Sequence, residues 1–145
     1  MVRVLVKKLN SSALLPSYKT NGASGMDLMA CIEKPINLKP GKSCLIPTGL
    51  SVAFSEEYEI QIRQRSGLAA KNNISVLNTP GTIDSDYRGE VAVILINLSQ
   101  QDFTITSGMR IAQMVIAPVT NCHREDASHL DISDRGTGGF GSTGL

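Results

Sequence analysis

The chain has 145 residues, a mass of 15.5 kDa and a formal net charge of +1, with 14 Lys plus Arg against 13 Asp plus Glu. This length favours a single domain with one core, and a hydrophobic content of 41% excludes a disordered chain. Because the charge is nearly neutral and both signs are mixed along the chain, sequence-independent binding to nucleic acid phosphates is disfavoured.

Short strands dominate the predicted elements. Apolar and polar residues alternate at 2–7 and at 58–63, which predicts two half-buried strands. The one helix that we expect is short, from Ser66 to Lys71, with the Ser66 hydroxyl as its cap. Nearly continuous apolar runs at 91–98 and 111–117 predict more deeply buried strands. Gly- and Pro-containing turn signals separate these stretches, so the pattern predicts an all-β sandwich or barrel.

The last part of the chain differs from the rest. From about residue 121 the apolar periodicity stops, so we expect a β domain over 1–120 and a C-terminal arm over 121–145. Composition alone favours a disordered terminus. Arg135 and Phe140 oppose that interpretation, because a cation and a ring on a glycine-rich segment suit closure over a base and its phosphates. The glycines of this segment are Gly136, Gly138, Gly139, Gly141 and Gly144.

Membrane insertion and export are both disfavoured. The longest apolar run, Val91 to Ile96, is far shorter than the roughly 20 residues of a membrane-spanning helix. Basic residues also interrupt the N-terminal apolar residues, unlike a signal peptide. Cys31, Cys44 and Cys122 are odd in number and lack metal-ligand spacing. We therefore expect three buried or half-buried free thiols in a cytoplasmic protein.

The segment from Pro80 to Glu90 lies between two strand-like stretches and is predicted to form a hairpin. It carries the carboxylates of Asp84 and Asp86 and the ring of Tyr87. A purely structural explanation exists, because Asp and Gly are common in turns. The functional alternative is a carboxylate that activates water beside a ring that holds a substrate. The residues of this segment alone leave both alternatives open.

Two further clusters suit an anionic ligand, although each is weak alone. The stretch from Arg63 to Leu68 places Arg, a hydroxyl and free N–H groups at the expected helix start, where anions bind. Gln113 lies inside an apolar strand and needs a hydrogen-bond partner. Asp27 follows Gly25 and adds one carboxylate, which by itself indicates a turn.

Five segments together resemble the motifs of the trimeric dUTPase family, in the family's order and over the whole chain. This resemblance implies hydrolysis of dUTP to dUMP and pyrophosphate, which removes dUTP from the DNA precursor pool and supplies dUMP for thymidylate synthesis. It implies a jelly-roll-like distorted β-barrel or sandwich and a homotrimer with shared active sites, without nucleic acid or membrane partners. Residues 135–145 would form a mobile lid on a neighbouring subunit. The five segments are Ala23–Ala30, Arg65–Ala69, Asn78 with Gly81–Glu90, Gly108–Val115 and Arg135–Gly144.

The resemblance also implies individual roles. Asp84 would deprotonate the water that attacks the α-phosphorus, and Tyr87 would pack beneath the deoxyribose. Asp27 would contact, through water, a Mg²⁺ ion held mainly by the substrate phosphates. The other substrate contacts would be Asn78, Gly81, Thr82 and Ile83 on uracil; Arg65, Ser66, Gly67 and Gln113 on the α- and β-phosphates; Arg135 on the γ-phosphate; Phe140 stacked on uracil; and Gly141 and Ser142 in the lid.

Two residues depart from the family pattern, and two other functions compete with it. Gln64 stands where the family usually has Pro, and Ser24 where it usually has Ala. A related dCTP deaminase shares the fold but needs a catalytic Glu, whereas the segment from Pro80 to Glu90 carries Asp84 in the dUTPase pattern. A non-catalytic jelly-roll module would give no reason for a ring and a cation on a glycine-rich tail.

Overall fold

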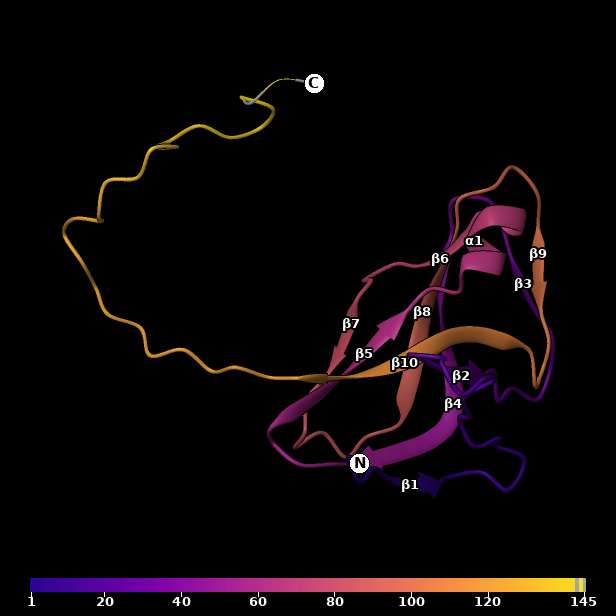
Figure 1. Cartoon of the computed structure of the whole chain (residues 1–145). Coiled ribbons are helices and arrows are strands. Elements are labelled where there is room, and N and C mark those ends of the chain that lie inside the picture. The colour runs from indigo at the N-terminus through magenta and orange to yellow at the C-terminus, as the bar shows by residue number, and fades with distance from the viewer. Residues whose placement is uncertain (143, 145) are drawn as a thin grey trace.

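Residues 1–142 and 144, which the computed structural model describes, form ten strands and one short helix (Figure 1). The expected all-β class with one short helix is confirmed. Thr143 and Leu145, which belong to the predicted lid, lie outside the described residues. The elements are β1 (Leu5–Lys8), β2 (Met26–Met29), β3 (Ile36–Leu38), β4 (Ser43–Ala53), β5 (Tyr58–Arg63), α1 (Ser66–Asn72), β6 (Ile74–Val76), β7 (Gly81–Ile83), β8 (Val91–Asn97), β9 (Phe103–Ile105) and β10 (Arg110–Pro118).

Two four-stranded antiparallel sheets form the body, in the strand orders β1-β4-β8-β6 and β2-β10-β5-β7, and β3 pairs with β9. The predicted strand at 58–63 coincides with β5, and those at 91–98 and 111–117 match β8 and β10 to within one residue at each end. The predicted first strand at 2–7 starts too early, because only Leu5–Lys8 pairs with β4. Periodicity thus predicted β5, β8 and β10, whereas β4, which is the longest described strand with 11 residues, was not predicted.

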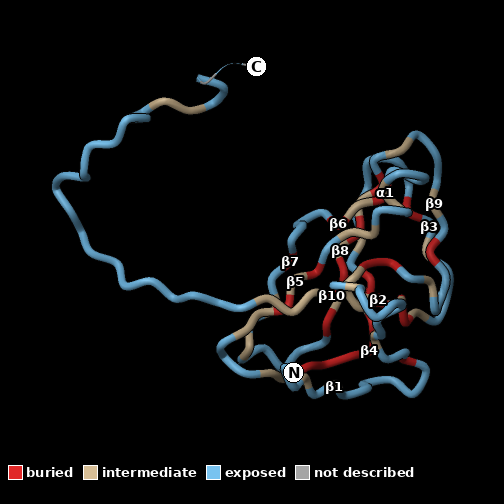
Figure 2. Tube along the Cα trace, viewed as in Figure 1, coloured by how far each residue is buried: buried red, intermediate tan, exposed pale blue. Residues whose placement is uncertain are grey.

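The core lies between the two four-stranded sheets (Figure 2). On β8, Val91, Val93 and Leu95 point inward and are at most 2% exposed, as the two-residue period of a strand requires. Ile60 and Ile62 contribute from β5 in the other sheet. Both sheets thus bury one apolar face against the other.

The outer face of the β1-β4-β8-β6 sheet also carries a group of apolar residues around β8. Ile94 and Ile96 point outward from β8 and are half-buried. Leu45, opposite Ile94 on β4, is 61% exposed, and Leu77 is 52% exposed. An antiparallel sheet that faces water ordinarily carries polar residues on that side. These four residues, called the outer apolar face below, are therefore a candidate contact surface for another protein chain.

The helix begins one residue earlier than a Ser66 cap would require. Ser66 is the first helical residue, and Arg65 occupies the N-cap position with no side-chain capping bond. The predicted capping role of Ser66 is therefore wrong. At the other end Asn73 adopts the left-handed conformation, with φ of 53°, which commonly terminates helices. No helix in residues 1–142 and 144 is long and apolar enough to cross a membrane.

After β10 the chain leaves the body and runs away from it as an extended arm (Figure 1). Two of its large apolar residues, Ile132 and Phe140, are fully exposed to solvent, with relative exposures of 101% and 114%. Cys122 is exposed in this arm, whereas Cys31 is buried and Cys44 half-buried. The expectation of a buried or half-buried thiol is thus wrong for Cys122, because the arm packs on no core.

Candidate active site

A pocket of about 440 Å³ lies beside the segment that joins β7 to β8. β7 pairs with β5, whereas β8 pairs with β4 and β6, so residues 84–90 pass from one sheet to the other. The predicted hairpin over Pro80 to Glu90 is therefore wrong, because its two strands pair with different partners. The pocket nevertheless brings together five residues that the sequence singled out: Asn78, Thr82, Ile83, Asp84 and Tyr87.

The outer apolar face continues into this pocket. Leu45 and Ile94 line it together with Ala92, and Glu90 lines it from the end of the linking segment. The pocket thus combines an apolar wall with a few polar groups, which is the composition of small-molecule sites.

Asp84 offers an uncommitted carboxylate to this pocket. Within the described residues, its side chain takes part in none of the ion pairs, which involve Asp27 and Asp102 instead. Its backbone carbonyl accepts a bond from the Tyr87 N–H at 3.1 Å, which closes a turn. An ionised carboxylate without a partner can accept a proton from water.

Tyr87 is held by its own loop. Its hydroxyl donates to the Glu90 carbonyl oxygen at 3.0 Å. The ring lies so close to Gly89 that a Cβ at that glycine would come within 2.5 Å of the ring carbon Cζ. Tyr87 is nevertheless 44% exposed. The ring is therefore held in position and remains accessible to a ligand.

Asp27 lies elsewhere, between two arginines. Its Oδ1 accepts from Arg65 Nε at 3.1 Å, and its Oδ2 accepts from Arg110 Nη1 at 3.2 Å. The Asp27 side chain is only 12% exposed, and a charge this far from water requires pairing. Asp27 therefore fixes Arg65 immediately before the helix. Arg110 was not predicted, because only the register of β10 against β2 places it there.

Gln113 has the hydrogen-bond partner that its place in an apolar strand requires. Its Nε2 donates to the Gln64 carbonyl oxygen at 3.0 Å, which confirms the expectation. The Gln64 side chain accepts in turn from the Thr79 hydroxyl at 2.5 Å. Gln64 thus joins β10 to the segment before β7.

Gly25 gives Gln113 the space that this contact needs. A Cβ at Gly25 would collide with Gln113 Oε1 and lie 3.1 Å from its Cδ. We expect Gly25→Ala to lower the free energy of unfolding by about 1–3 kcal/mol, as overpacking commonly does, measured by urea denaturation. Gly22→Ala is the matched control, because a Cβ there meets nothing within 4 Å. Equal stability of the two variants would contradict the expected collision.

The residues predicted to hold phosphates do not reach Asp84 within one chain. Arg65, Ser66, Gly67 and Gln113 are absent from the lining of the 440 Å³ pocket. Gln113 instead lines a separate hollow of about 450 Å³ with Gln64 and Thr79. A single chain therefore holds the predicted site in two separate parts.

The arm residues form a third part. Arg135 Nε donates to the Gly138 carbonyl oxygen at 2.7 Å, and Phe140 has a positive φ of 51°. Gly141 also has a positive φ, and the Ser142 N–H donates to the Gly139 carbonyl at 3.0 Å. None of the described arm residues lines the pocket of Asp84.

Comparisons with known proteins point to one family. A family model described as dUTPase matches residues 11–144. The chain is 58% identical to a deoxyuridine 5'-triphosphate nucleotidohydrolase of Treponema denticola, over 95% of this chain and 96% of that protein. It is 54% identical to the protein of the same name from Rickettsia felis, over 100% of this chain and 99% of that one.

Solved structures give the same fold. A mutant dUTPase of Staphylococcus bacteriophage 80alpha with dUpNHpp matches with a TM-score of 0.85 and 23% identity, covering 99% of each chain. A mutant dUTPase of phage phi11 of S. aureus, described with a structural Mg(II) ion, matches with a TM-score of 0.81 and 20% identity, over 90% of this chain and 99% of that one. These likenesses confirm the expected jelly-roll-like fold.

Proposed function

The chain belongs to the dUTPase family and is a dUTP diphosphatase, and we propose that the pocket of Asp84 binds the nucleoside of dUTP and supplies the base for its hydrolysis. Water attacks the α-phosphorus, and dUMP and pyrophosphate leave. The observation that carries the proposal is the convergence of Asn78, Asp84 and Tyr87 on one pocket.

Uracil is recognised by the edge of a sheet. β7 is the last strand in the order β2-β10-β5-β7, so its outer backbone edge has no strand partner among the described residues. Successive residues of a strand direct their backbone groups to opposite edges. One of Thr82 and Ile83 therefore presents its N–H and C=O outward, where they can pair with a planar base much as a further strand would. Asn78, whose amide lies against Gly81, adds a side-chain donor and acceptor. A base with a different polar edge would leave these groups unpaired.

The proposed reaction begins with the carboxylate of Asp84. Tyr87 packs beneath the deoxyribose and leaves no room for a 2′-hydroxyl, which orients the α-phosphate toward Asp84. Because the Asp84 side chain makes no ion pair within the described residues, it can accept the proton of the attacking water. A positioned general base of this kind contributes about 10²–10⁴-fold to a rate.

We propose that the complete site forms in a homotrimer. Asp84 and the phosphate-binding group of Arg65, Ser66, Gly67 and Gln113 lie apart within one chain. The outer apolar face adjoins the Asp84 pocket and is more than half exposed at Leu45 and Leu77, so a second subunit docked there would bring its phosphate-binding group to the pocket. A third subunit would supply the arm, with Arg135 on the γ-phosphate and Phe140, Gly141 and Ser142 over the base.

The residues fit a Mg²⁺ ion that arrives with the substrate. Among residues 1–142 and 144, no three His, Cys, Asp or Glu side chains lie close enough to hold a metal ion by themselves. Both oxygens of Asp27 already accept guanidinium bonds, which leaves lone pairs for a water on the ion but disfavours direct coordination. Mg²⁺ usually keeps several waters and binds substrate phosphates. Bound there, the ion would neutralise phosphate charge during the displacement.

We also propose that the protein works in the cytoplasm, without a nucleic acid or membrane partner. Its three cysteines are free thiols, which a reducing compartment maintains. Its net charge of +1 provides no strong attraction for polyanions.

The proposal is tested by pyrophosphate release from dUTP, dCTP, dTTP and UTP. We expect release from dUTP with Mg²⁺, and a rate at least about tenfold lower after chelation with EDTA, because the phosphate charge is then no longer neutralised. Ammonia release from dCTP would instead indicate a deaminase. A protein that binds nucleotides but turns over none of them would be a non-catalytic module.

A further inference from the structure

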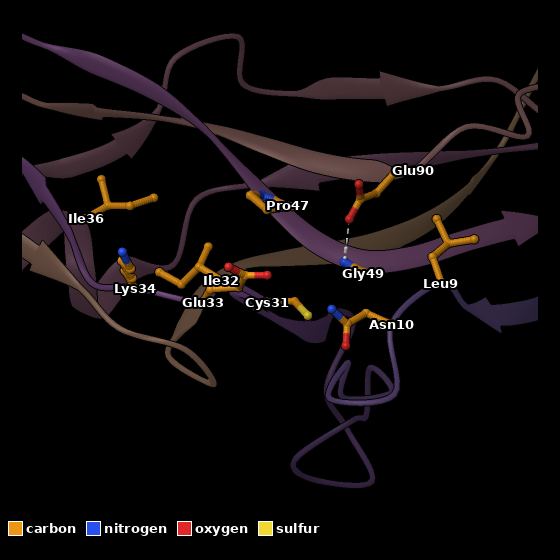
Figure 3. A pocket seen from close by; sticks show the side chains of 10 residues that line it. All are labelled: Leu9, Asn10, Cys31, Ile32, Glu33, Lys34, Ile36, Pro47, Gly49 and Glu90. Carbon is orange, nitrogen blue, oxygen red and sulfur yellow. Dashed lines mark hydrogen bonds between the residues drawn. The ribbon is translucent and has the colours of Figure 1, made fainter.

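The segment that carries Tyr87 is hydrogen-bonded to one short stretch of β4. The Thr48 hydroxyl donates to the Val91 carbonyl oxygen at 2.5 Å, and the Ser51 hydroxyl donates to the Arg88 carbonyl oxygen at 2.8 Å. Between them, the Gly49 N–H donates to Glu90 Oε1 at 2.8 Å (Figure 3). Arg88 and Glu90 of the linking segment and Val91 at the start of β8 are therefore tied to β4 shortly after Tyr87.

Gly49 can serve as the anchor because the ladder of β4 is interrupted there. The register against β8 shifts between Pro47 and Leu50, and Gly49 has a positive φ of 69°. A Cβ at Gly49 would lie 2.8 Å from the Ala13 Cβ and 2.9 Å from the Cys31 Sγ. This bulge turns a backbone N–H away from the strand ladder, and the Glu90 carboxylate satisfies it.

Glu90 therefore connects β4 to Tyr87 through one residue. Its side chain accepts from Gly49, and its backbone carbonyl accepts from the Tyr87 hydroxyl. A carboxylate that accepts from a backbone N–H makes a charge-assisted bond, stronger than a neutral one. If this bond is lost, the carbonyl that positions the Tyr87 ring is held less firmly.

We propose that Glu90 is a positioning residue that fixes Tyr87 and thereby sets the preference for 2′-deoxyribose over ribose. The inference rests on the proposed function, in which Tyr87 packs beneath the sugar. In this proposal Glu90 does not touch the reacting atoms. It acts only by holding the Tyr87 ring in position.

The test compares kcat/KM for dUTP and UTP in Glu90 variants. Glu90→Ala is expected to lower the dUTP/UTP ratio about tenfold, the worth of one charge-assisted hydrogen bond, mainly through KM. Glu90→Gln keeps an acceptor oxygen and should retain most of the preference. Glu33→Ala is the control, because Glu33 is an exposed carboxylate in the same surface pocket as Glu90 (Figure 3) and should leave the ratio unchanged.

Hydrogen exchange at the Gly49 amide, followed by NMR, measures the Gly49–Glu90 contact independently of enzymatic activity. Exchange should accelerate in Glu90→Ala and stay slow in Glu90→Gln and Glu33→Ala. An unchanged dUTP/UTP ratio in folded Glu90→Ala would overturn the inference while leaving the proposed function intact. A wild-type protein that does not hydrolyse dUTP would overturn both.

Discussion

Asp84→Asn is expected to lower the turnover of dUTP by about 10²–10⁴-fold, the usual contribution of a general base. Asparagine has nearly the same shape as aspartate but cannot accept a proton from water at neutral pH. Because Asp84 makes no ion pair in the described part of the chain, the substitution breaks no such structural contact. The affinity for a non-hydrolysable dUTP analogue, measured by calorimetry, should therefore change only a few-fold.

Asp86→Asn is the matched control for this prediction. Asp86 is also exposed on the segment between β7 and β8, and its replacement changes the charge by the same amount. It does not line the pocket, so its turnover should remain close to that of the wild type. If both variants lost activity equally, the effect would come from the charge of the segment, and Asp84 would not be the base.

Periodicity predicted three of the longer strands, and it missed β4 and the short strands for physical reasons. In β4, which has 11 residues, Pro47 and the bulge at Gly49 interrupt the pattern. β5, β8 and β10 have 6, 7 and 9 residues, enough for an alternating or continuous apolar pattern to be visible. β6 and β7 have 3 residues each, and so short a stretch carries no recognisable period. The partner of β7 was therefore not predictable either, which is why the segment after it looked like a hairpin.

Sequence reasoning found the site residues that are neighbours in the chain. Asp84 and Tyr87 are close in sequence and line one pocket. The pairing of Asp27 with Arg65 and Arg110 spans 38 and 83 residues, respectively, and depends on the strand register. The bond from Gly49 to Glu90 spans 41 residues and depends on how β4, with its bulge, pairs with β8. Contacts that depend on strand pairing thus needed the structure.

Deleting residues 135–145 is expected to leave a folded protein with at least about 100-fold lower turnover, since positioning and exclusion of water are worth this much. The described residues of this segment add nothing to the core, and Phe140 is fully exposed. The thermal midpoint and the mass in solution should match those of the full chain. A truncated protein that unfolds would instead show that the segment is structural.

Co-assembly of two inactive variants tests whose site the arm completes in the proposed homotrimer. Truncated chains keep Asp84 but lack the arm, whereas Asp84→Asn chains keep the arm but lack the base. If each arm serves a neighbour, co-assembly of the two inactive chains creates sites with Asp84 from one chain and an arm from another, and activity returns. If each arm closed over its own Asp84, no mixture would contain a complete site. Recovery of activity on mixing would therefore support the shared sites that the separation of Asp84 from Arg65, Gln113 and the arm suggests.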